Sequence, residues 1–138
     1  MKSLITNSNT QQSDIIMICE TKGNPPKMDG YKWHTKNRTS QKGGGVAIAV
    51  KTELHKYSSK LDDLEDNNQE VLWVELKIPK NDIIHLGVYY GKQENEPKEE
   101  IEREYSQLRT QIIRLKRKGK IILAEDFNAK LEINKTGP

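Results

Sequence analysis

A single long amphipathic segment, residues 97–118, lies between stretches of strand-like sequence. Its apolar residues recur at intervals of three and four, which is the spacing of one face of an α-helix. Pro97 suits the first turn of a helix, acidic residues gather in the N-terminal half, and basic residues followed by Gly119 suit the end. A helix with one apolar face must bury that face against another layer. The members of the stripe are Ile101, Tyr105, Leu108, Ile112 and Leu115.

The other regular segments are short apolar runs that predict β-strands. Residues 70–78 and 83–90 alternate apolar side chains between two faces, and the KNDI sequence between them predicts a hairpin turn. We expect loops in NPPKMDGYKW and in the acidic SSKLDDLEDNNQ stretch. The expected order is four strands, the helix and a last strand, hence a mixed α/β fold. The expected strands are residues 14–20, 70–78, 83–90 and 120–125, together with the apolar part of GGGVAIAV (43–50), which begins with a glycine turn.

Length and composition indicate one domain that does not cross a membrane. The chain has 138 residues, of which 33% are hydrophobic and 31% charged, a lean composition for a complete α/β domain. No apolar run is long enough to span a bilayer, and the N-terminus lacks the apolar core of a signal peptide, so we expect an intracellular protein. A single cysteine, Cys19, excludes an internal disulfide. The net charge of +3 is compatible with a phosphate-rich partner.

Carboxylates stand where two of the apolar strands end. Glu20 follows IIMIC, and Glu125 and Asp126 follow IILA, with Asn128 close behind. In open α/β sheets, ligand-binding groups collect beyond the carboxyl ends of strands. Two converging carboxylates suit Mg²⁺, or Mn²⁺ in its place, and such a cation could hold a phosphodiester. On spacing alone, ordinary polar turns explain these residues better than a metal site does.

Five sequence stretches, in this order, resemble the endonuclease/exonuclease/phosphatase superfamily. They are DIIMICETK, GGGVAIAV, LWVELKI, IIHLGVYYG and IILAEDFNAKL. The superfamily includes pancreatic deoxyribonuclease, apurinic endonucleases and the endonuclease domains of non-LTR retrotransposons, and the glycine-rich stretch and DFNAKL are most similar to the retrotransposon branch. The resemblance implies a two-sheet sandwich with flanking helices and a metal-dependent phosphodiesterase activity on DNA. It also implies a nuclear location.

The resemblance assigns roles to four residues. Glu20 matches the metal-binding glutamate of the superfamily, and Tyr89 matches a tyrosine that contacts the scissile phosphate. Asp126 and Asn128 match the catalytic aspartate, which activates or positions water, and its partner asparagine. The expected cofactor is Mg²⁺ or Mn²⁺ and the expected partner is DNA.

Three departures from the family pattern reduce the activity that we expect. Glu125 replaces the glycine of the usual GDFN motif, which adds bulk and negative charge beside the predicted site. Only thirteen residues precede Asp14, too few for the family's first strand and the helix after it. The Asp-His pair of the family's C-terminal half does not occur in the sequence. We therefore expect residues 1–138 to form a single partial domain with weak or no activity.

Two functions from different classes remain open at this stage. The first is the metal-dependent DNA endonuclease fragment of retroelement origin, and the second is a non-catalytic remnant that binds nucleic acid or protein. The other conspicuous residues favour neither. We expect His34 and His55 at the surface, His85 as a hydrogen-bonded structural residue, and Cys19 and Trp73 in the core. The sequence does not indicate an oligomeric state.

Overall fold

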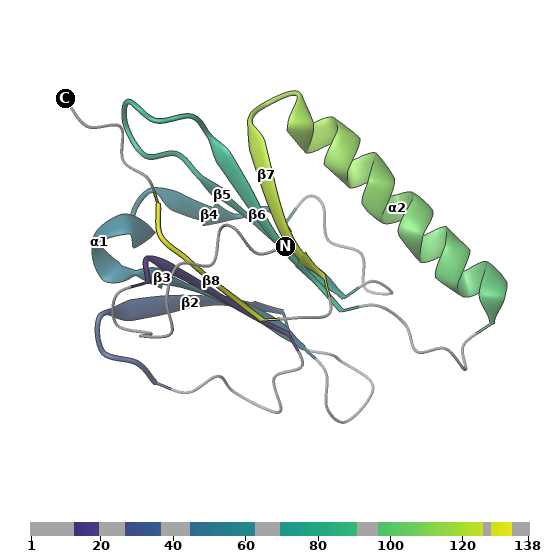
Figure 1. The fold of residues 1–138 in the computed structure, drawn as a ribbon, viewed down its shortest axis with the longest axis horizontal. Helices are drawn as coiled ribbons and strands as arrows, with labels where there is room; N and C mark the ends of the chain where they lie inside the picture. Colours follow the sequence, from purple (N-terminus) through teal and green to yellow (C-terminus); the bar gives the residue numbers. More distant parts are fainter. Residues whose placement is uncertain are drawn as a thin grey trace.

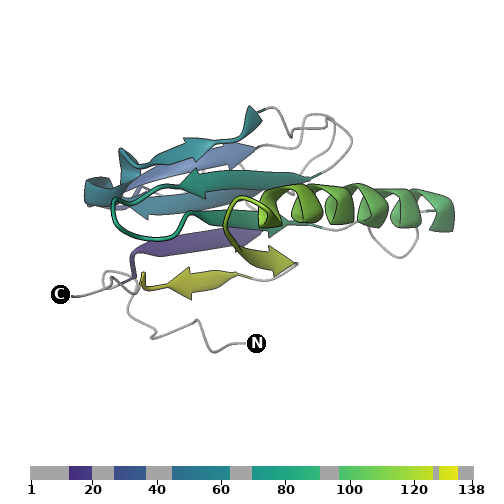
Figure 2. The ribbon, with the colours of Figure 1, turned by 90° about the horizontal axis from the view of Figure 1, so that it is seen from above.

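Two four-stranded sheets face each other, and one long helix covers the outer face of the second sheet (Figures 1 and 2). The computed structural model describes residues 13–19, 27–36, 45–62, 70–90, 97–125 and 128–133. The first sheet has the order β2-β3-β1-β8 and the second β4-β5-β6-β7. The elements are β1 (Ile15–Cys19), β2 (Tyr31–Lys36), β3 (Val46–Lys51), α1 (Thr52–His55), β4 (Ser58–Lys60), β5 (Val71–Leu76), β6 (Ile84–Tyr89), α2 (Lys98–Lys116), β7 (Lys120–Glu125) and β8 (Ala129–Leu131).

The predicted α/β architecture, a two-sheet sandwich flanked by helix, is confirmed. All strand pairs are antiparallel except β6 with β7, which are parallel because α2 carries the chain back between them. The expected loops were wrong in part. Tyr31 to Trp33 begin β2, and Ser58 to Lys60 form β4. Within the described residues, no helix is long and apolar enough to cross a membrane.

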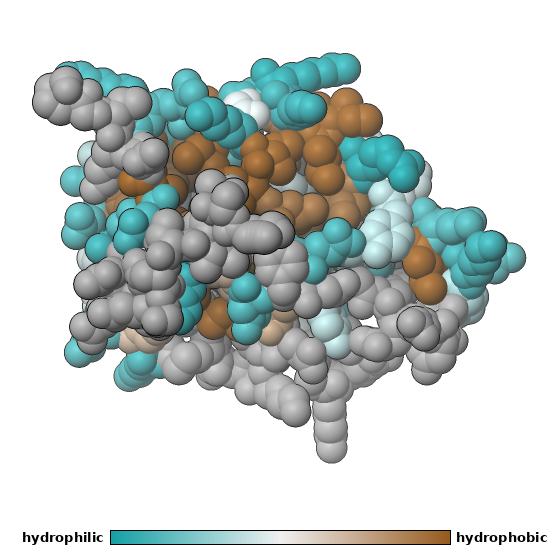
Figure 3. Space-filling view, in the orientation of Figure 1, coloured by the Kyte–Doolittle hydropathy of each residue, from teal (hydrophilic) through white to brown (hydrophobic). Residues whose placement is uncertain are grey.

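The alternation in β5 and β6 divides the apolar residues between two cores. Leu72 and Leu86, with the other side chains on their face, join residues of β1 and β3 between the two sheets. Trp73 and Tyr89 point the other way, where they pack with Leu108 of α2. Both faces of the second sheet are therefore covered. Of the predicted stripe of α2, Leu108, Ile112 and Leu115 belong to this core, whereas Tyr105 is 40% exposed. Apolar side chains also reach the surface on the side where β7 lies (Figure 3).

Trp73 fills the space above a glycine in the neighbouring strand. A Cβ atom added to Gly87 would lie 2.5 Å from the Trp73 ring, so the absence of a side chain lets the indole lie directly on β6. The indole Nε1–H donates to the Gln111 side-chain oxygen of α2 at 3.2 Å. Trp73 is 2% exposed, which confirms its predicted place in the core.

The turn from α2 into β7 depends on Gly119. A Cβ atom at this position would lie 2.3 Å from the carbonyl oxygen of Ile83, and the next residue, Lys120, donates its N–H to the same carbonyl at 2.8 Å. The glycine thus permits the close approach that starts the parallel pairing of β7 with β6. Gly119 was expected only as a helix stop, and this contact adds a second reason for it.

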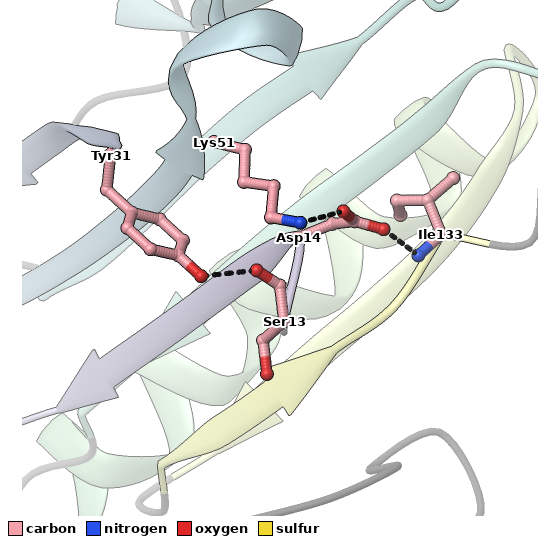
Figure 4. Close-up of polar contacts among 5 residues, drawn as sticks. All are labelled: Ser13, Asp14, Tyr31, Lys51 and Ile133. Atoms are coloured by element: carbon pink, nitrogen blue, oxygen red, sulfur yellow. Dashed lines mark hydrogen bonds and ion pairs between the residues drawn. The ribbon is translucent and has the colours of Figure 1, made fainter. Parts of the chain in front are cut away.

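Polar contacts fix the beginning of β1 to its neighbours in the first sheet (Figure 4). The Asp14 carboxylate accepts the backbone N–H of Ile133 at 2.8 Å and lies 3.4 Å from the Lys51 ammonium group. The Tyr31 hydroxyl donates to the Ser13 carbonyl oxygen at 2.5 Å. These contacts reach from β1 to the segments around β2, β3 and β8, and so they hold one end of the sheet together.

One side of the sandwich is closed by polar contacts between β2 and β4. His34 and the Ser58 hydroxyl lie 2.9 Å apart, and the Lys60 ammonium group donates to the Thr35 carbonyl oxygen at 2.9 Å. The ring of His34 stacks on that of His55 with 4.7 Å between centroids. Both histidines, which were expected at the surface, are half-buried.

This histidine pair makes stability depend on pH. Burial, His55 and Lys60 lower the pKa of His34 from 6.5 to about 4, and burial followed by Lys32 lowers the pKa of His55. The unfolded chain therefore binds protons more readily, so the stabilisation is complete above pH 6.5 and is lost as the pH falls towards 4. We expect the melting temperature of the wild type to fall more steeply over this range than that of a His34→Gln, His55→Gln double variant. If plots of melting temperature against pH run parallel for the wild type and the double variant, the two histidines do not cause the pH dependence.

Candidate functional site

The structure describes two of the four predicted site residues, Tyr89 and Asn128. Glu20 and Asp126 lie outside the described residues. The prediction that these two carboxylates lie close together therefore stays a prediction. The described residues next to them nevertheless define one end of the sandwich.

A hydrogen bond joins the end of β1 to the residue before β8. The backbone N–H of Cys19 donates to Oδ1 of Asn128 at 2.8 Å, although the two residues are 109 positions apart in the sequence. The Cys19 thiol donates to the Tyr89 carbonyl oxygen at 3.7 Å, so the end of β6 is at the same place. Glu125, the last residue of β7, pairs with Tyr89. The carboxyl ends of β1, β6 and β7 thus meet, as the strand-end argument required.

Asn128 has one of its two polar atoms occupied. Because Oδ1 accepts the Cys19 N–H, the atom that remains for a ligand is the Nδ2 amide donor. The residue is exposed, and its amide donor suits an anionic oxygen such as that of a phosphate better than it suits a cation. This geometry is compatible with the orienting role that the resemblance implies for Asn128.

Tyr89 lies differently from what a phosphate contact needs. Its side chain is completely buried beneath α2, and its hydroxyl donates to Oε1 of Glu104 at 2.5 Å. The ring also meets Tyr105 edge to face, with centroids 5.8 Å apart. The hydroxyl of Tyr89 is therefore engaged within the α2 core, on the opposite face of the second sheet from the first sheet. Tyr90, the next residue, packs against the core between the sheets and is half-buried.

Sequence reasoning missed Glu104 and Glu70. Glu104 is 4% exposed and belongs to the buried face of α2, three residues after Ile101 and four before Leu108, so its position on the apolar stripe was a usable signal. Oε2 of Glu70 accepts the N–H of Gly45 at 2.9 Å, which links the start of β5 to the start of β3 across the two sheets. No sequence pattern indicates that contact.

Glu125 is the residue that the resemblance aligns with a glycine. It is half-buried at the end of β7, and strand alternation puts it with Ile121 and Leu123 on the face that α2 covers. The strand accommodates the glutamate without a break in its pairing with β6.

The strand-end pattern and the resemblance assign a metal ion to Glu20 and Asp126, which lie outside the described residues. In the part of the chain that the structure describes, no group of three histidine, cysteine or acidic residues could hold a metal ion. One side-chain oxygen of Glu70 and one of Asn128 each accept a hydrogen bond from a backbone N–H. The donor chemistry of Glu20 and Asp126 fits a hard cation, and the hydrogen bond between Cys19 and Asn128 joins the residues that flank them.

The histidines do not contribute to this end of the sandwich. His85 is completely buried in the middle of the second sheet, where Nε2 lies 3.1 Å from Oε2 of Glu75, as expected for a structural histidine. His34 and His55 lie at the β2–β4 side. Cys19 is buried, as predicted.

Comparison with known proteins identifies no relative of the chain. No protein-family model, no curated protein and no solved structure matches it.

Proposed function

We propose that the chain is part of a metal-dependent phosphodiesterase domain that cleaves DNA, of the kind found in non-LTR retrotransposons. The observation that carries the proposal is the hydrogen bond from the Cys19 N–H to Asn128 Oδ1. Cys19 immediately precedes Glu20, and Asn128 follows Asp126 by two residues. Two segments that resemble catalytic motifs, and that lie far apart in the sequence, therefore meet at the carboxyl ends of strands.

In this proposal each residue has a limited task. Glu20 and Asp126 would hold Mg²⁺ or Mn²⁺, which would supply positive charge to neutralise a phosphate and the departing oxygen. The Nδ2 group of Asn128 donates to a phosphate oxygen, and its Oδ1 fixes the side chain to the backbone of β1. Asp126 also accepts a proton from, or positions, the attacking water.

The same residues cover only part of the chemistry. The resembling nucleases use an Asp-His pair for proton transfer and charge stabilisation, and no such pair occurs in these 138 residues. The Tyr89 hydroxyl is bound to Glu104, so it does not offer a phosphate contact. We therefore propose weak or absent turnover for the 138-residue chain alone.

Metal binding tests the proposal independently of turnover. We expect the chain to bind Mn²⁺ in calorimetric titrations, and Glu20→Gln and Asp126→Asn each to weaken that binding at least about tenfold, a loss typical even of outer-shell partners of a metal. Glu99→Gln is the matched control, because it removes the same charge from an exposed position in the first turn of α2. Equal affinities for the wild type and all three variants would refute the proposed metal site.

A second candidate is a non-catalytic piece that binds nucleic acid or protein. The observation in its favour is that a polar side-chain atom of Tyr89 and one of Asn128 are each used in a hydrogen bond within the chain, to Glu104 and to Cys19. The exposed basic residues at the end of α2, including Lys116 and Arg117, offer a contact for phosphates. DNA binding measured by fluorescence anisotropy with a chelator present, and unchanged by Asp126→Ala, would favour this candidate over the first.

A further inference from the structure

The two open sides of the sandwich are built differently. On one side, β4 is only three residues long, and contacts such as Lys60 to Thr35 tie it to β2. On the other side lie β7 and β8, at the ends of their sheets. Short, charged strands protect a sheet edge from pairing with another chain. The β4 edge has this protection, and the β7 edge, residues 120–125, lacks it.

The backbone of β7 offers hydrogen-bonding groups on its outer side. Lys120 donates its N–H towards β6, to the Ile83 carbonyl oxygen. Because successive residues of a strand direct their backbone groups to opposite sides, Ile121, Leu123 and Glu125 direct theirs outward. Among the described strands, none pairs with this side of β7. The strand is therefore an available template for a further strand.

The middle of the β7 edge is apolar. Ile121, Ile122, Leu123 and Ala124 follow one another without a charge or a proline, and the first three are only half-buried, whereas their partners in β6 from His85 to Gly87 are buried. Figure 3 shows apolar surface where β7 lies in Figure 1. An uncharged apolar edge of this length is unusual for a sheet exposed to water.

We infer that the β7 edge pairs with the β7 edge of a second copy of this chain, in antiparallel orientation. The distribution of charge along β7 favours a second copy as the partner, in antiparallel orientation. The exposed Lys116, Arg117, Lys118 and Lys120 precede the apolar stretch, and Glu125 follows it, so the strand runs from a basic end to an acidic end. The exposed Asp82, 3.4 Å from Lys120, offsets only one of those positive charges. Antiparallel pairing brings the basic end of each copy to the acidic end of the other, whereas parallel pairing would bring like ends together.

The pairing would stop at two copies. Each chain has one β7 edge, and a twofold axis near Leu123 uses both edges in a single contact. The product is one eight-stranded sheet that joins the second sheets of the two copies. The two α2 helices then cover the same face of this sheet. The core between the two sheets also loses part of its contact with water, because Ile122 lies at its margin.

Sedimentation equilibrium of the purified chain, without metal or DNA, tests this inference. We expect a reversible monomer–dimer equilibrium. Leu123→Pro removes an outward N–H while leaving the bonds to β6 intact, so we expect it to raise the dimer dissociation constant at least about tenfold. Ile122→Lys places a charge at the margin of the apolar edge, and we expect the same direction of change. The matched control is Ile113→Lys on α2, which makes the same substitution at a residue that is 52% exposed.

Each outcome decides the inference. A dimer weakened by Ile122→Lys and by a folded Leu123→Pro variant, and unchanged by Ile113→Lys, supports it. If circular dichroism shows that Leu123→Pro does not fold, the comparison of Ile122→Lys with Ile113→Lys decides alone. A monomer at all concentrations, open-ended assembly, or a dimer that Ile122→Lys leaves intact would overturn it.

Discussion

Supercoiled plasmid DNA incubated with the purified 138-residue chain and Mg²⁺ is expected to stay intact for times in which pancreatic deoxyribonuclease degrades it. A general acid or base commonly contributes about 10²–10⁴-fold to a rate, and the chain has no histidine near the meeting point of β1, β6 and β7 to take that role. His85, the histidine in β6, is completely buried and lies beside Glu75. The Tyr89 hydroxyl is also engaged elsewhere, by Glu104.

The plasmid assay has an internal control and a clear contrary result. Glu125→Gly introduces the glycine of the resembling nucleases but supplies no group for proton transfer, so we expect no recovery of nicking. Comparison of reactions with and without a chelator identifies contaminating activity that needs no metal. Robust nicking that the chelator abolishes and that Asp126→Ala also abolishes would show that these 138 residues contain a sufficient site.

Trp73→Ala is expected to lower the free energy of unfolding by about 3–5 kcal/mol, the usual cost of removing a buried Trp or Phe side chain. The indole lies on Gly87 and beneath α2, with 2% of its surface exposed, and it donates to Gln111. Its removal would leave a cavity between helix and sheet that Leu108 and Tyr89 cannot fill without moving. Such a loss is a large part of the total stability of a small domain.

Urea denaturation followed by circular dichroism measures this effect. Trp33→Ala is the control, because Trp33 lies half-buried in the edge strand β2 and should cost less. Gly87→Ala probes the same contact from the other side, since its methyl group would overlap the Trp73 ring, and we expect destabilisation of about 1–3 kcal/mol. Equal losses for Trp73→Ala and Trp33→Ala would show that the indole does not support α2.

The elements that the sequence predicted correctly are those with strong internal patterns. α2 has an apolar stripe, suitable ends and Gly119, and β5 and β6 have clean alternation. The strands that escaped prediction, β2, β4 and β8, have polar or short sequences such as SSK and AKL. These segments form strands because an adjacent strand, distant in the sequence, supplies their hydrogen bonds. A local sequence pattern does not show which strand will be adjacent.

Prediction of the site was limited by a related problem. Alternation correctly put Tyr89 on the face opposite Leu86 and Val88, but both faces of β6 are buried. The sequence therefore could not say which face meets α2 and which meets the other sheet. That choice decides whether the Tyr89 hydroxyl meets Glu104 or a ligand. The strand-end pattern and the family resemblance both implied that these two segments meet, but neither indicated the hydrogen bond from Cys19 to Asn128.

The pairing of β1 with β8 has a consequence for the order of events during folding. The second sheet and α2 come from one continuous stretch, residues 58–125, whereas the first sheet needs Ile15 and Leu131 side by side. Contacts between distant residues close large loops and form slowly compared with local ones. The second sheet can therefore form first and act as a surface on which β1 and β3 assemble. The candidate site, which needs the Cys19–Asn128 contact across 109 positions, acquires its geometry at the end of that process.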